Sequence, residues 1–185
     1  MKIKSIGSQL APLKLESIQG RQVSIPDATS LTHLQFRRFA GCPMCQLHIR
    51  SFIQRHDELQ AHGIAEVAVF HSSKKSMLAH HSQAPFPLIA DPLKTLYREF
   101  GVESSLMSLL HPKAWPAAMS GLWRHGMGLP GFGESITGLP ADFLIDQKGR
   151  VIAVKYGEHA YDQWSVDELI ALASRYHDVN DAHSA

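Results

Sequence analysis

Cys42 and Cys45 are the only two cysteines of the chain, and two residues separate them. The apolar run at residues 31–39 comes just before them and predicts a buried strand. An amphipathic helical pattern follows, and Pro43 suits its first position, where the missing N–H of proline costs nothing. The sequence therefore predicts a C-x-x-C pair at the junction between a strand and the N-terminus of a helix.

This position favours thiol chemistry. A helix N-terminus leaves N–H groups unsatisfied and carries a partial positive charge, which stabilises the thiolate, the reactive form of cysteine. We expect Cys42 to be the exposed attacking thiolate and Cys45, partly buried one turn into the helix, to be the resolving thiol. Attack on a peroxide would give a sulfenic acid, and attack on a disulfide a mixed disulfide; Cys45 would resolve either. Both reactions start from the dithiol and end in the disulfide, so the sequence distinguishes poorly between a peroxide and a disulfide as substrate. The alternative is a pair of inert thiols.

Three histidines are candidate partners for the cysteines in a zinc site, namely His71, His80 and His81. However, C-x-x-C supplies only two ligands, and a second pair at zinc-finger spacing is absent. With twelve histidines in the chain, some pairs lie close together by chance. We therefore expect no metal and no cofactor.

The composition is that of an ordinary globular protein, with 185 residues of which 44% are hydrophobic and 19% charged. This length fits one domain, residues 1–185. The net charge of +1 gives no reason to expect nucleic acid or a membrane surface as a partner, and no apolar run approaches the ~20 residues of a membrane-spanning helix. Residues 1–7 lack the apolar block of a secretory signal, so we expect the protein in the cytoplasm and the cysteine pair to be catalytic or redox-sensing.

The remaining pattern predicts strands and helices in alternation. Residues 10–25 alternate around Gln19 and Gly20 and predict a hairpin. The helix after Cys42 is expected to end at Gly63, with His48 outside the buried face, which carries Cys45, Ile49, Phe52, Ile53 and Leu59. Residues 64–70 predict a strand parallel to the strand at 31–39.

Further along the chain, residues 73–82 predict a short helix and residues 86–91 a brief apolar segment. Residues 92–100 predict a helix that buries Leu93, Leu96, Tyr97 and Phe100. A second hairpin is expected at residues 138–156. Ser165 and Glu168 form a capping-box pattern at the start of the last helix, and residues 178–185 are expected to be a frayed, flexible tail.

Residues 102–137 interrupt this order. Their apolar side chains, among them Trp115 and Trp123, follow no strict period, although residues 115–126 could form a short amphipathic helix. Because these side chains need cover, we interpret the segment as an insertion that packs on the core. The alternatives are a substrate pocket and a contact within a homodimer.

The order of these elements resembles the thioredoxin fold, and four stretches resemble the peroxiredoxin-like alkyl hydroperoxide reductase / thiol-specific antioxidant family. They are the hairpin at 15–25, the junction at 41–45, the segment 86–102 with its Phe-Pro-Leu, Asp and Tyr, and the strand pair at 139–151. The resemblance implies an α/β fold whose central mixed sheet is flanked by helices, with a peroxiredoxin-type N-terminal hairpin. It also implies reduction of hydroperoxides through Cys42, with Cys45 as resolving thiol and a thioredoxin- or glutathione-type reductant.

Two positions depart from the family pattern. Peroxiredoxins carry Thr or Ser three residues before the peroxidatic cysteine, where this chain has Phe39 before Cys42. The family's arginine three residues before a later phenylalanine is replaced by Pro140, a position where thioredoxins have a cis-proline. A cis X–Pro bond costs only about 0.5–1 kcal/mol relative to trans, so we expect a cis Pro140 beside the cysteines. The alternative is an ordinary strand-entry proline.

Arg37 and Arg38 are unusual at the end of a buried strand. Either could replace the missing arginine and stabilise the thiolate, with Arg38 as our candidate, or both could be solvated charges. These departures keep two other functions open. One is a thioredoxin-like reductase of disulfides, and the other is a redox sensor that reports oxidation without turnover.

Overall fold

The computed structural model describes residues 3–102 and 138–184, and its centre is a sheet with strand order β5-β4-β3-β6-β7, accompanied by a hairpin of β1 and β2. The strands are β1 Leu13–Glu16, β2 Gln22–Ile25, β3 Leu31–Arg37, β4 Ile64–Phe70, β5 Leu88–Ala90, β6 Ala141–Ile145 and β7 Val151–Tyr156. The helices are α1 Pro43–Gln54, α2 His56–Ala61, α3 Lys74–His81, α4 Thr95–Glu99 and α6 Val166–Ser184. Apart from Val102, the predicted insertion at 102–137 and its helix at 115–126 lie outside the described residues.

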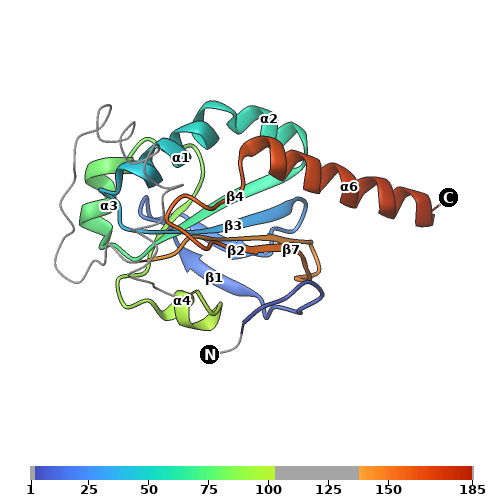
Figure 1. Cartoon of the computed structure of the whole chain (residues 1–185), viewed down its shortest axis with the longest axis horizontal. Coiled ribbons are helices and arrows are strands. Elements are labelled where there is room, and N and C mark those ends of the chain that lie inside the picture. Colours follow the sequence, from blue (N-terminus) through green and yellow to red (C-terminus); the bar gives the residue numbers. More distant parts are fainter. Residues whose placement is uncertain (1–2, 103–137, 185) are drawn as a thin grey trace.

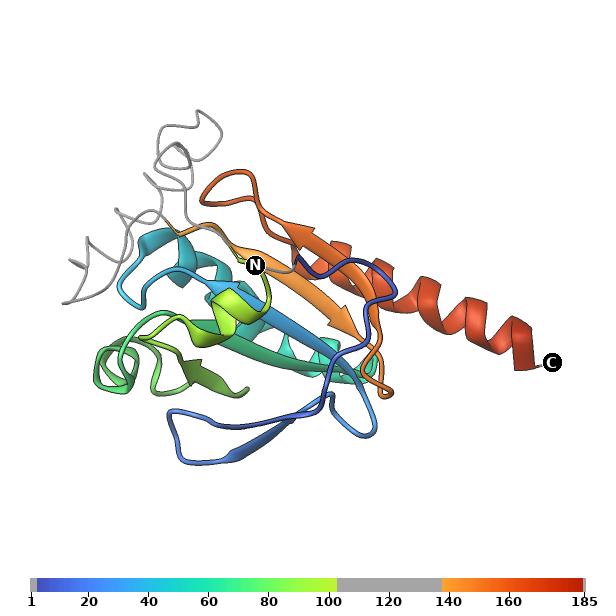
Figure 2. The same ribbon diagram turned by 90° about the horizontal axis from the view of Figure 1, so that it is seen from below.

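The sheet is mixed. β3 pairs in parallel with β4, and β4 with β5, whereas β6 is antiparallel to both β3 and β7. Helices α1, α2 and α6 cover one face, while the β1–β2 hairpin and α4 lie on the other (Figures 1 and 2). This arrangement confirms the predicted α/β, thioredoxin-like fold with a central mixed sheet flanked by helices.

The N-terminal hairpin turns where the sequence predicted. Gly20 has a φ of +81°, a left-handed conformation that glycine adopts at no steric cost. The turn is tied to the edge of the main sheet, because the Ile18 N–H donates to the Leu88 carbonyl over 2.8 Å.

Helices α1 and α2 replace the single helix predicted between Cys42 and Gly63. The break lies at Arg55, whose φ of −113° falls outside the helical region. The Arg55 guanidinium binds both carboxylate oxygens of Glu58, at 2.6 and 2.7 Å, and Asp167 of α6 at 2.6 Å. The partner on α6 is 112 residues away in the sequence, so the local helical pattern does not reveal it.

Helix α4 is shorter than predicted, and Leu93 lies outside it with 76% of its surface exposed. Lys94 has a φ of 55°, and the Asp91 carboxylate accepts the first backbone N–H groups of the helix at 2.8–2.9 Å. This turn directs Leu93 to solvent. The other three predicted apolar residues are buried: Leu96, Tyr97 and Phe100.

Helix α6 begins with the predicted capping box. The Glu168 N–H donates to Ser165 Oγ over 3.2 Å, and the Ser165 N–H donates to Glu168 Oε2 over 2.8 Å. The helix continues to Ser184, where the sequence predicted a frayed tail, and its C-terminal part projects beyond the sheet (Figure 1). Within this part, the Asn180 amide donates to the Tyr176 carbonyl over 2.9 Å.

Strand β3 separates two hydrophobic clusters, one on each face of the sheet. Leu34 and Phe36 belong to the cluster shared with the hairpin and α4. His33, Gln35 and Arg37 alternate with them, so they lie on the face covered by α1 and α6, and all three are buried. A stripe of polar side chains therefore runs beneath the helix that begins after Cys42.

Candidate active site

Cys42 is the N-cap residue of α1, with an extended backbone at φ −68° and ψ 118°. Pro43 occupies the first helical position, as predicted. The Cys42 carbonyl accepts the Gln46 N–H over 3.0 Å, and the Cys42 N–H donates to the Phe39 carbonyl over 3.0 Å. The chain thus turns sharply between β3 and α1 and places the Cys42 sulfur at the start of the helix.

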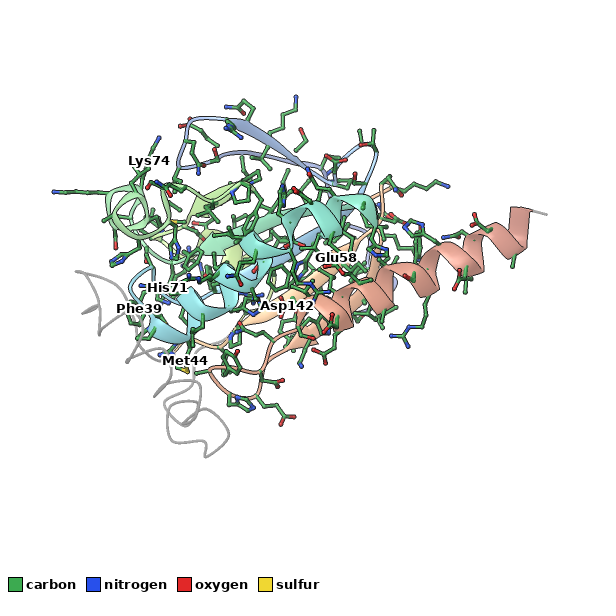
Figure 3. The ribbon with its side chains drawn as sticks, turned by 90° about the horizontal axis from the view of Figure 1, so that it is seen from above. Phe39, Met44, Glu58, His71, Lys74 and Asp142 are labelled. Atoms are coloured by element: carbon green, nitrogen blue, oxygen red, sulfur yellow. The ribbon has the colours of Figure 1, made fainter. Side chains whose placement is uncertain are left out.

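The turn before Cys42 is held by residues that follow β4. The Ala40 N–H donates to Ser72 Oγ over 2.8 Å, and His81 Nε2 donates to the Ala40 carbonyl over 3.1 Å. Burial lowers the pKa of His81 to about 4, so its ring is neutral at pH 7. Figure 3 labels Phe39, Met44 and His71 at this end of the molecule. These contacts fix the backbone that carries the cysteine.

Arg38 is a charged residue whose side chain contacts the candidate nucleophile. Its Nη1 lies 3.6 Å from Cys42 Sγ, and its guanidinium lies 5.8 Å from the centre of the Phe39 ring. Arg38 is almost fully buried, so the predicted alternative of a solvated charge is wrong for this residue. A buried guanidinium this close to the sulfur favours the thiolate over the thiol.

The two cysteines differ in acidity. Burial opposes ionisation of Cys42, but the Cys45 thiol donates a hydrogen bond to it. Together with the Arg38 charge and the backbone N–H groups of Cys45 and Met44, this bond lowers the pKa of Cys42 to about 6. Burial, the same hydrogen bond and the charge on Cys42 raise the pKa of Cys45 well above its ordinary value. Neither cysteine forms a disulfide, so the structure shows the dithiol state of the site.

Cys42 is less accessible than predicted, because only 1% of its surface is exposed, and Cys45 is 2% exposed. Both belong to the hydrophobic cluster that contains Phe39, Met44 and Ile49. The expectation of an exposed attacking sulfur is therefore wrong. The physical reason is that both sulfurs belong to this buried cluster and not to the surface at the helix end.

Pro140 lies directly before β6, and its peptide bond is not cis, contrary to our expectation. Within residues 3–102 and 138–184 the only cis peptide bond is Ile25–Pro26. The Pro140 carbonyl accepts the Gly157 N–H over 2.9 Å, which extends the β6–β7 ladder by one pair. Pro140 and Gly157 also line a cavity together with Tyr156. Pro140 is thus a strand-entry proline, the alternative reading of the sequence.

Arg37 takes no part in the contact with Cys42. It is fully buried, and its Nη2 donates to Asp142 Oδ1 over 2.5 Å and to His48 Nε2 over 2.7 Å. Its Nε donates to Gln35 Oε1 over 3.0 Å. His48 can be buried because its ring accepts this hydrogen bond from Arg37. The sequence had placed it outside the buried face of α1.

His33 extends this buried polar network toward β4. Its Nδ1 lies 2.7 Å from Glu66 Oε2, and its Nε2 lies 3.0 Å from Asp142 Oδ1. Burial disfavours the imidazolium, but the two carboxylates outweigh it and raise the pKa of His33 to about 9. For Asp142, burial is outweighed by Arg37 and His33, which hold its pKa well below the usual range. Three buried ion pairs are therefore joined inside the molecule, namely His33–Glu66, His33–Asp142 and Arg37–Asp142.

Sequence reasoning missed this network. A signal was present, because His33, Gln35 and Arg37 occupy every second position of a strand that is otherwise apolar. Polar residues at that period on a fully buried strand require polar partners on the neighbouring strands. The register supplies them, since β3 pairs His33 with Glu66 of β4, and Asp142 lies on β6 two positions from the residue opposite His33.

The histidines considered as zinc ligands have other surroundings. His81 binds the Ala40 carbonyl, and the His71 ring contacts Tyr97 with centroids 5.7 Å apart. Within the part of the chain that the structure describes, no group of three or more His, Cys, Asp or Glu residues is arranged to hold a metal ion. None of the described helices is long and apolar enough to cross a membrane.

The chain matches the AhpC/TSA family over residues 6–154, and it belongs to that family. This finding confirms the resemblance seen in the sequence and supports a thiol redox function. Comparison with curated proteins gave no match.

Solved structures with a similar fold include both peroxiredoxins and a thiol–disulfide protein. Peroxidoxin BcpB from Mycobacterium tuberculosis is 17% identical, with a TM-score of 0.69 over 94% of this chain and 98% of the other. The reduced 2-Cys peroxiredoxin of Plasmodium vivax is 15% identical, with a TM-score of 0.69 over 95% and 98%. A putative thiol:disulfide interchange protein DsbE from Chlorobium tepidum is 19% identical, with a TM-score of 0.59 over 91% and 98%. At these identities the likeness shows the thioredoxin-type fold.

Proposed function

We propose that this protein reduces hydroperoxides through the Cys42 thiolate, with Cys45 as the resolving thiol. The observation that carries the proposal is the environment of Cys42 Sγ, which lies at the N-terminus of α1 and 3.6 Å from Arg38 Nη1. With a pKa of about 6, most of Cys42 is thiolate at pH 7, and the thiolate is the nucleophile. The burial of Cys42 favours a small substrate such as a hydroperoxide over a disulfide in a folded protein.

The reaction has two steps. In the first, Cys42 Sγ attacks an oxygen of the hydroperoxide, the S–O bond forms, the O–O bond breaks, and the departing alkoxide or hydroxide takes up a proton. In the second, Cys45 Sγ attacks the sulfenic sulfur, the S–S bond forms, and the hydroxyl group leaves as water with the proton of the Cys45 thiol. The raised pKa of Cys45 supports this division, because Cys45 keeps its proton while Cys42 reacts.

A thioredoxin- or glutathione-type thiol would restore the dithiol. Two thiols of such a reductant reduce the Cys42–Cys45 disulfide and leave as one disulfide. We propose this class of partner on the strength of family membership.

A second candidate function is thiol–disulfide exchange. The spacing of Cys42 and Cys45 across the first turn of α1 supports it, and so does Phe39 at the position where peroxiredoxins carry Thr or Ser. The reduction potential of the Cys42–Cys45 pair distinguishes a disulfide reductase from a redox sensor or an oxidase. A value near the ~−270 mV of thioredoxin suits a reductase, whereas a much more oxidising couple suits a sensor or an oxidase.

The experiment that tests the proposal compares second-order rates of the reduced protein with hydrogen peroxide, an organic hydroperoxide and a small disulfide. The variants are wild type, Cys42→Ser and Cys45→Ser. We expect peroxide reaction orders of magnitude faster than that of a free thiol, lost in Cys42→Ser and retained in Cys45→Ser, whose sulfenic acid persists. If peroxide reacts no faster than with a free thiol while disulfides are reduced readily, the exchange function replaces the peroxidase function.

A further inference from the structure

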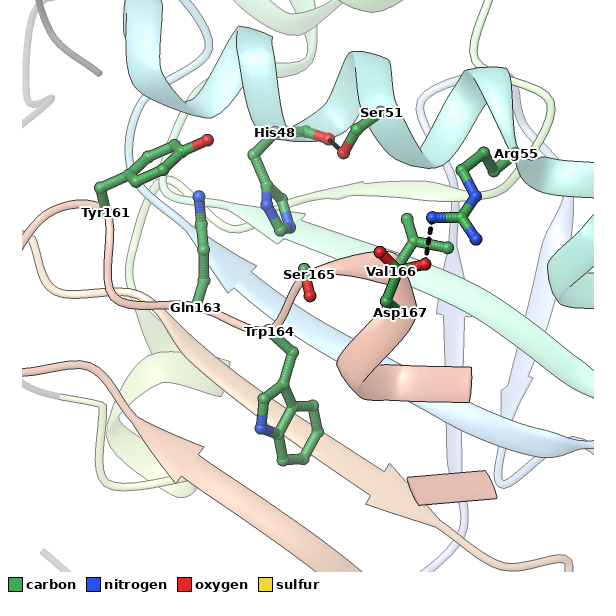
Figure 4. Close-up of a pocket in the computed structure, with 9 residues that line it drawn as sticks. All are labelled: His48, Ser51, Arg55, Tyr161, Gln163, Trp164, Ser165, Val166 and Asp167. Atoms are coloured by element: carbon green, nitrogen blue, oxygen red, sulfur yellow. Dashed lines mark hydrogen bonds and ion pairs between the residues drawn. The ribbon is translucent and has the colours of Figure 1, made fainter. Parts of the chain in front are cut away.

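A cavity of about 270 Å³ lies between α1 and the segment that leads into α6 (Figure 4). One wall is formed by α1 and the residue that follows it, and the other by residues 161–165 together with the first residues of α6. The polar side chains in its wall are His48, Ser51, Arg55, Tyr161, Gln163 and Asp167.

The Gln163 amide is the one group in the wall of this cavity whose buried nitrogen lacks a hydrogen-bond partner among the described residues. Gln163 is only 9% exposed, and its Nε2 is buried with no hydrogen-bond partner among the described residues. Figure 4 shows this amide directed into the space between Tyr161 and His48. A buried N–H group without an acceptor is unfavourable, and a ligand that accepts hydrogen bonds would remove that cost.

His48 provides a second donor. Arginine only donates hydrogen bonds, so Arg37 Nη2, 2.7 Å away, requires His48 Nε2 to be the acceptor. Burial and the Arg37 charge lower the pKa of His48 well below its ordinary value, so the ring is neutral and Nδ1 carries its proton. Together with the Tyr161 hydroxyl, the wall of the cavity offers three groups that donate.

The charged groups around the cavity are paired with one another. Arg55 binds Asp167 over 2.6 Å and both carboxylate oxygens of Glu58 at 2.6 and 2.7 Å. Glu168 accepts the Ser165 N–H in the capping box of α6, whose N-terminus borders the cavity. The hydrogen-bond donors in the wall, rather than net charge, therefore select the ligand, and they fit the oxygens of a carboxylate.

The cavity lies within reach of the reactive sulfur along α1. His48 is six residues after Cys42, which is about 9 Å along a helix axis. A thiol bound to Cys42 could therefore place a carboxylate on its own chain beside His48.

We propose that this cavity binds the carboxylate of a low-molecular-weight thiol that reduces the Cys42–Cys45 disulfide. The proposal rests on the proposed function, because it names the reductant of the same site. The thiolate of the reductant attacks Cys42 Sγ, a mixed disulfide forms, and Cys45 leaves as a thiolate that takes up a proton. A second reductant thiolate then attacks the sulfur of the first, releasing Cys42 as thiolate and a small disulfide as product.

The test uses two thiols of equal length, 6-mercaptohexanoate and 6-mercaptohexanol, against the oxidised protein. We expect the carboxylate thiol to react about tenfold faster at equal thiolate concentration, the size of effect expected for a hydrogen bond to a charged group. Gln163→Leu should abolish this preference, and Tyr161→Phe should reduce it. The matched control is Gln54→Leu, an exposed glutamine on α1, which should keep the preference. Equal rates for the two thiols with the wild type would overturn the proposal.

Binding is measured separately from redox chemistry by titrating hexanoate, which has no thiol, into the reduced protein and following the side-chain NMR signals of Gln163 and His48. Saturable shifts that Gln163→Leu removes support the site, and an absence of shifts contradicts it. Slow oxidation by peroxide alongside such shifts would refute the peroxidase function and leave the carboxylate site standing. The two failures are therefore distinguishable.

Discussion

Arg37 and Arg38 are adjacent in the sequence, and both are buried, yet their guanidinium groups have different partners. Arg37 lies in the network with Asp142, Gln35 and His48, each of which accepts a hydrogen bond from its guanidinium. Arg38 lies 3.6 Å from the Cys42 sulfur, a group whose charge changes during the reaction. The comparison shows how one strand end supplies a structural charge and a chemical charge at consecutive positions, because Arg37 is the last residue of β3 and Arg38 the first residue of the turn that leads to Cys42.

The two regions also shift the pKa of their titratable groups in opposite directions. In the network, His33 holds its proton more strongly than in water, whereas Cys42 at the reactive site releases its proton more easily. Against the effect of burial, two carboxylates raise the pKa of His33, whereas the hydrogen bond from Cys45 and the Arg38 guanidinium lower the pKa of Cys42. The predictions below test whether the two arginines are separable in this way.

The largest effect is expected from Arg37→Met. This change leaves Asp142 buried with one of its two cationic partners removed, and breaking a buried pair in this way costs about 3–5 kcal/mol. Urea denaturation should show this loss in the free energy of unfolding. The pKa of Cys42, followed by thiolate absorbance in the variant at low temperature, should stay near 6. A large rise in that pKa would show that the two regions are not independent.

Arg38→Met should produce the converse result. Without the guanidinium, the pKa of Cys42 should rise from about 6, while the hydrogen bond from Cys45 remains, so the thiolate fraction at pH 7 should fall severalfold. Thiolate absorbance against pH measures this directly. Arg38→Lys is the matched control, since it keeps a positive charge and should retain most of the lowered pKa. An unchanged titration in Arg38→Met would exclude Arg38 from a role at the sulfur.

A smaller effect concerns stability against pH. The pKa of His33 is raised from 6.5 to about 9 on folding, so its contribution is complete below pH 6.5 and is lost as the pH rises through 9. The pKa of Cys42 is lowered from 9.0 to about 6, so its contribution is complete above pH 9 and is lost as the pH falls through 6. Between pH 6.5 and 9 the two trends oppose each other.

We therefore expect the reduced Cys42→Ser variant to lose stability more steeply than wild type between pH 6.5 and 9, because only the falling contribution of His33 remains. Urea midpoints at several pH values under reducing conditions measure the difference. Parallel curves for the two proteins would contradict the lowered pKa of Cys42.

The smallest effect is expected from Ser165→Ala, which removes the cap of α6 and touches neither arginine. Loss of such a cap costs about 1 kcal/mol. The free energy of unfolding should fall by that amount, and the Cys42 titration should remain the same. A shift in the titration would mean that general loss of stability moves the pKa, and the Arg38→Met result would then lose its meaning.

The sequence predicted the parts of this molecule that depend on local pattern. The hairpin around Gly20, the strand-to-helix junction at Cys42 with Pro43 in the first turn, and the capping box at Ser165 all appear in the structure. Each of these is encoded within a few residues. The family resemblance added the fold class, a central mixed sheet flanked by helices, which local pattern does not provide.

The parts that were wrong depend on contacts between distant residues. At the helix break, Arg55 binds Asp167 of α6. Buried His48 accepts a hydrogen bond from Arg37, which also binds Asp142. The trans Pro140 pairs with Gly157 of the neighbouring chain segment. Cys42 is buried in a hydrophobic cluster whose members come from several strands and helices. None of these partners can be identified from spacing alone, although the polar residues at alternate positions of β3 indicated that a network was needed.

The most direct test of the central claim is the rate of the reduced protein with hydrogen peroxide as a function of pH, measured by stopped flow from pH 4 to 9. The account predicts a rate that rises with half-maximum near pH 6, reaches a plateau by pH 7–8, and is lost in Cys42→Ser. A half-maximum near pH 9, or a plateau no faster than a free thiol, would contradict the claim that Arg38 and the start of α1 make Cys42 a peroxide-reactive thiolate.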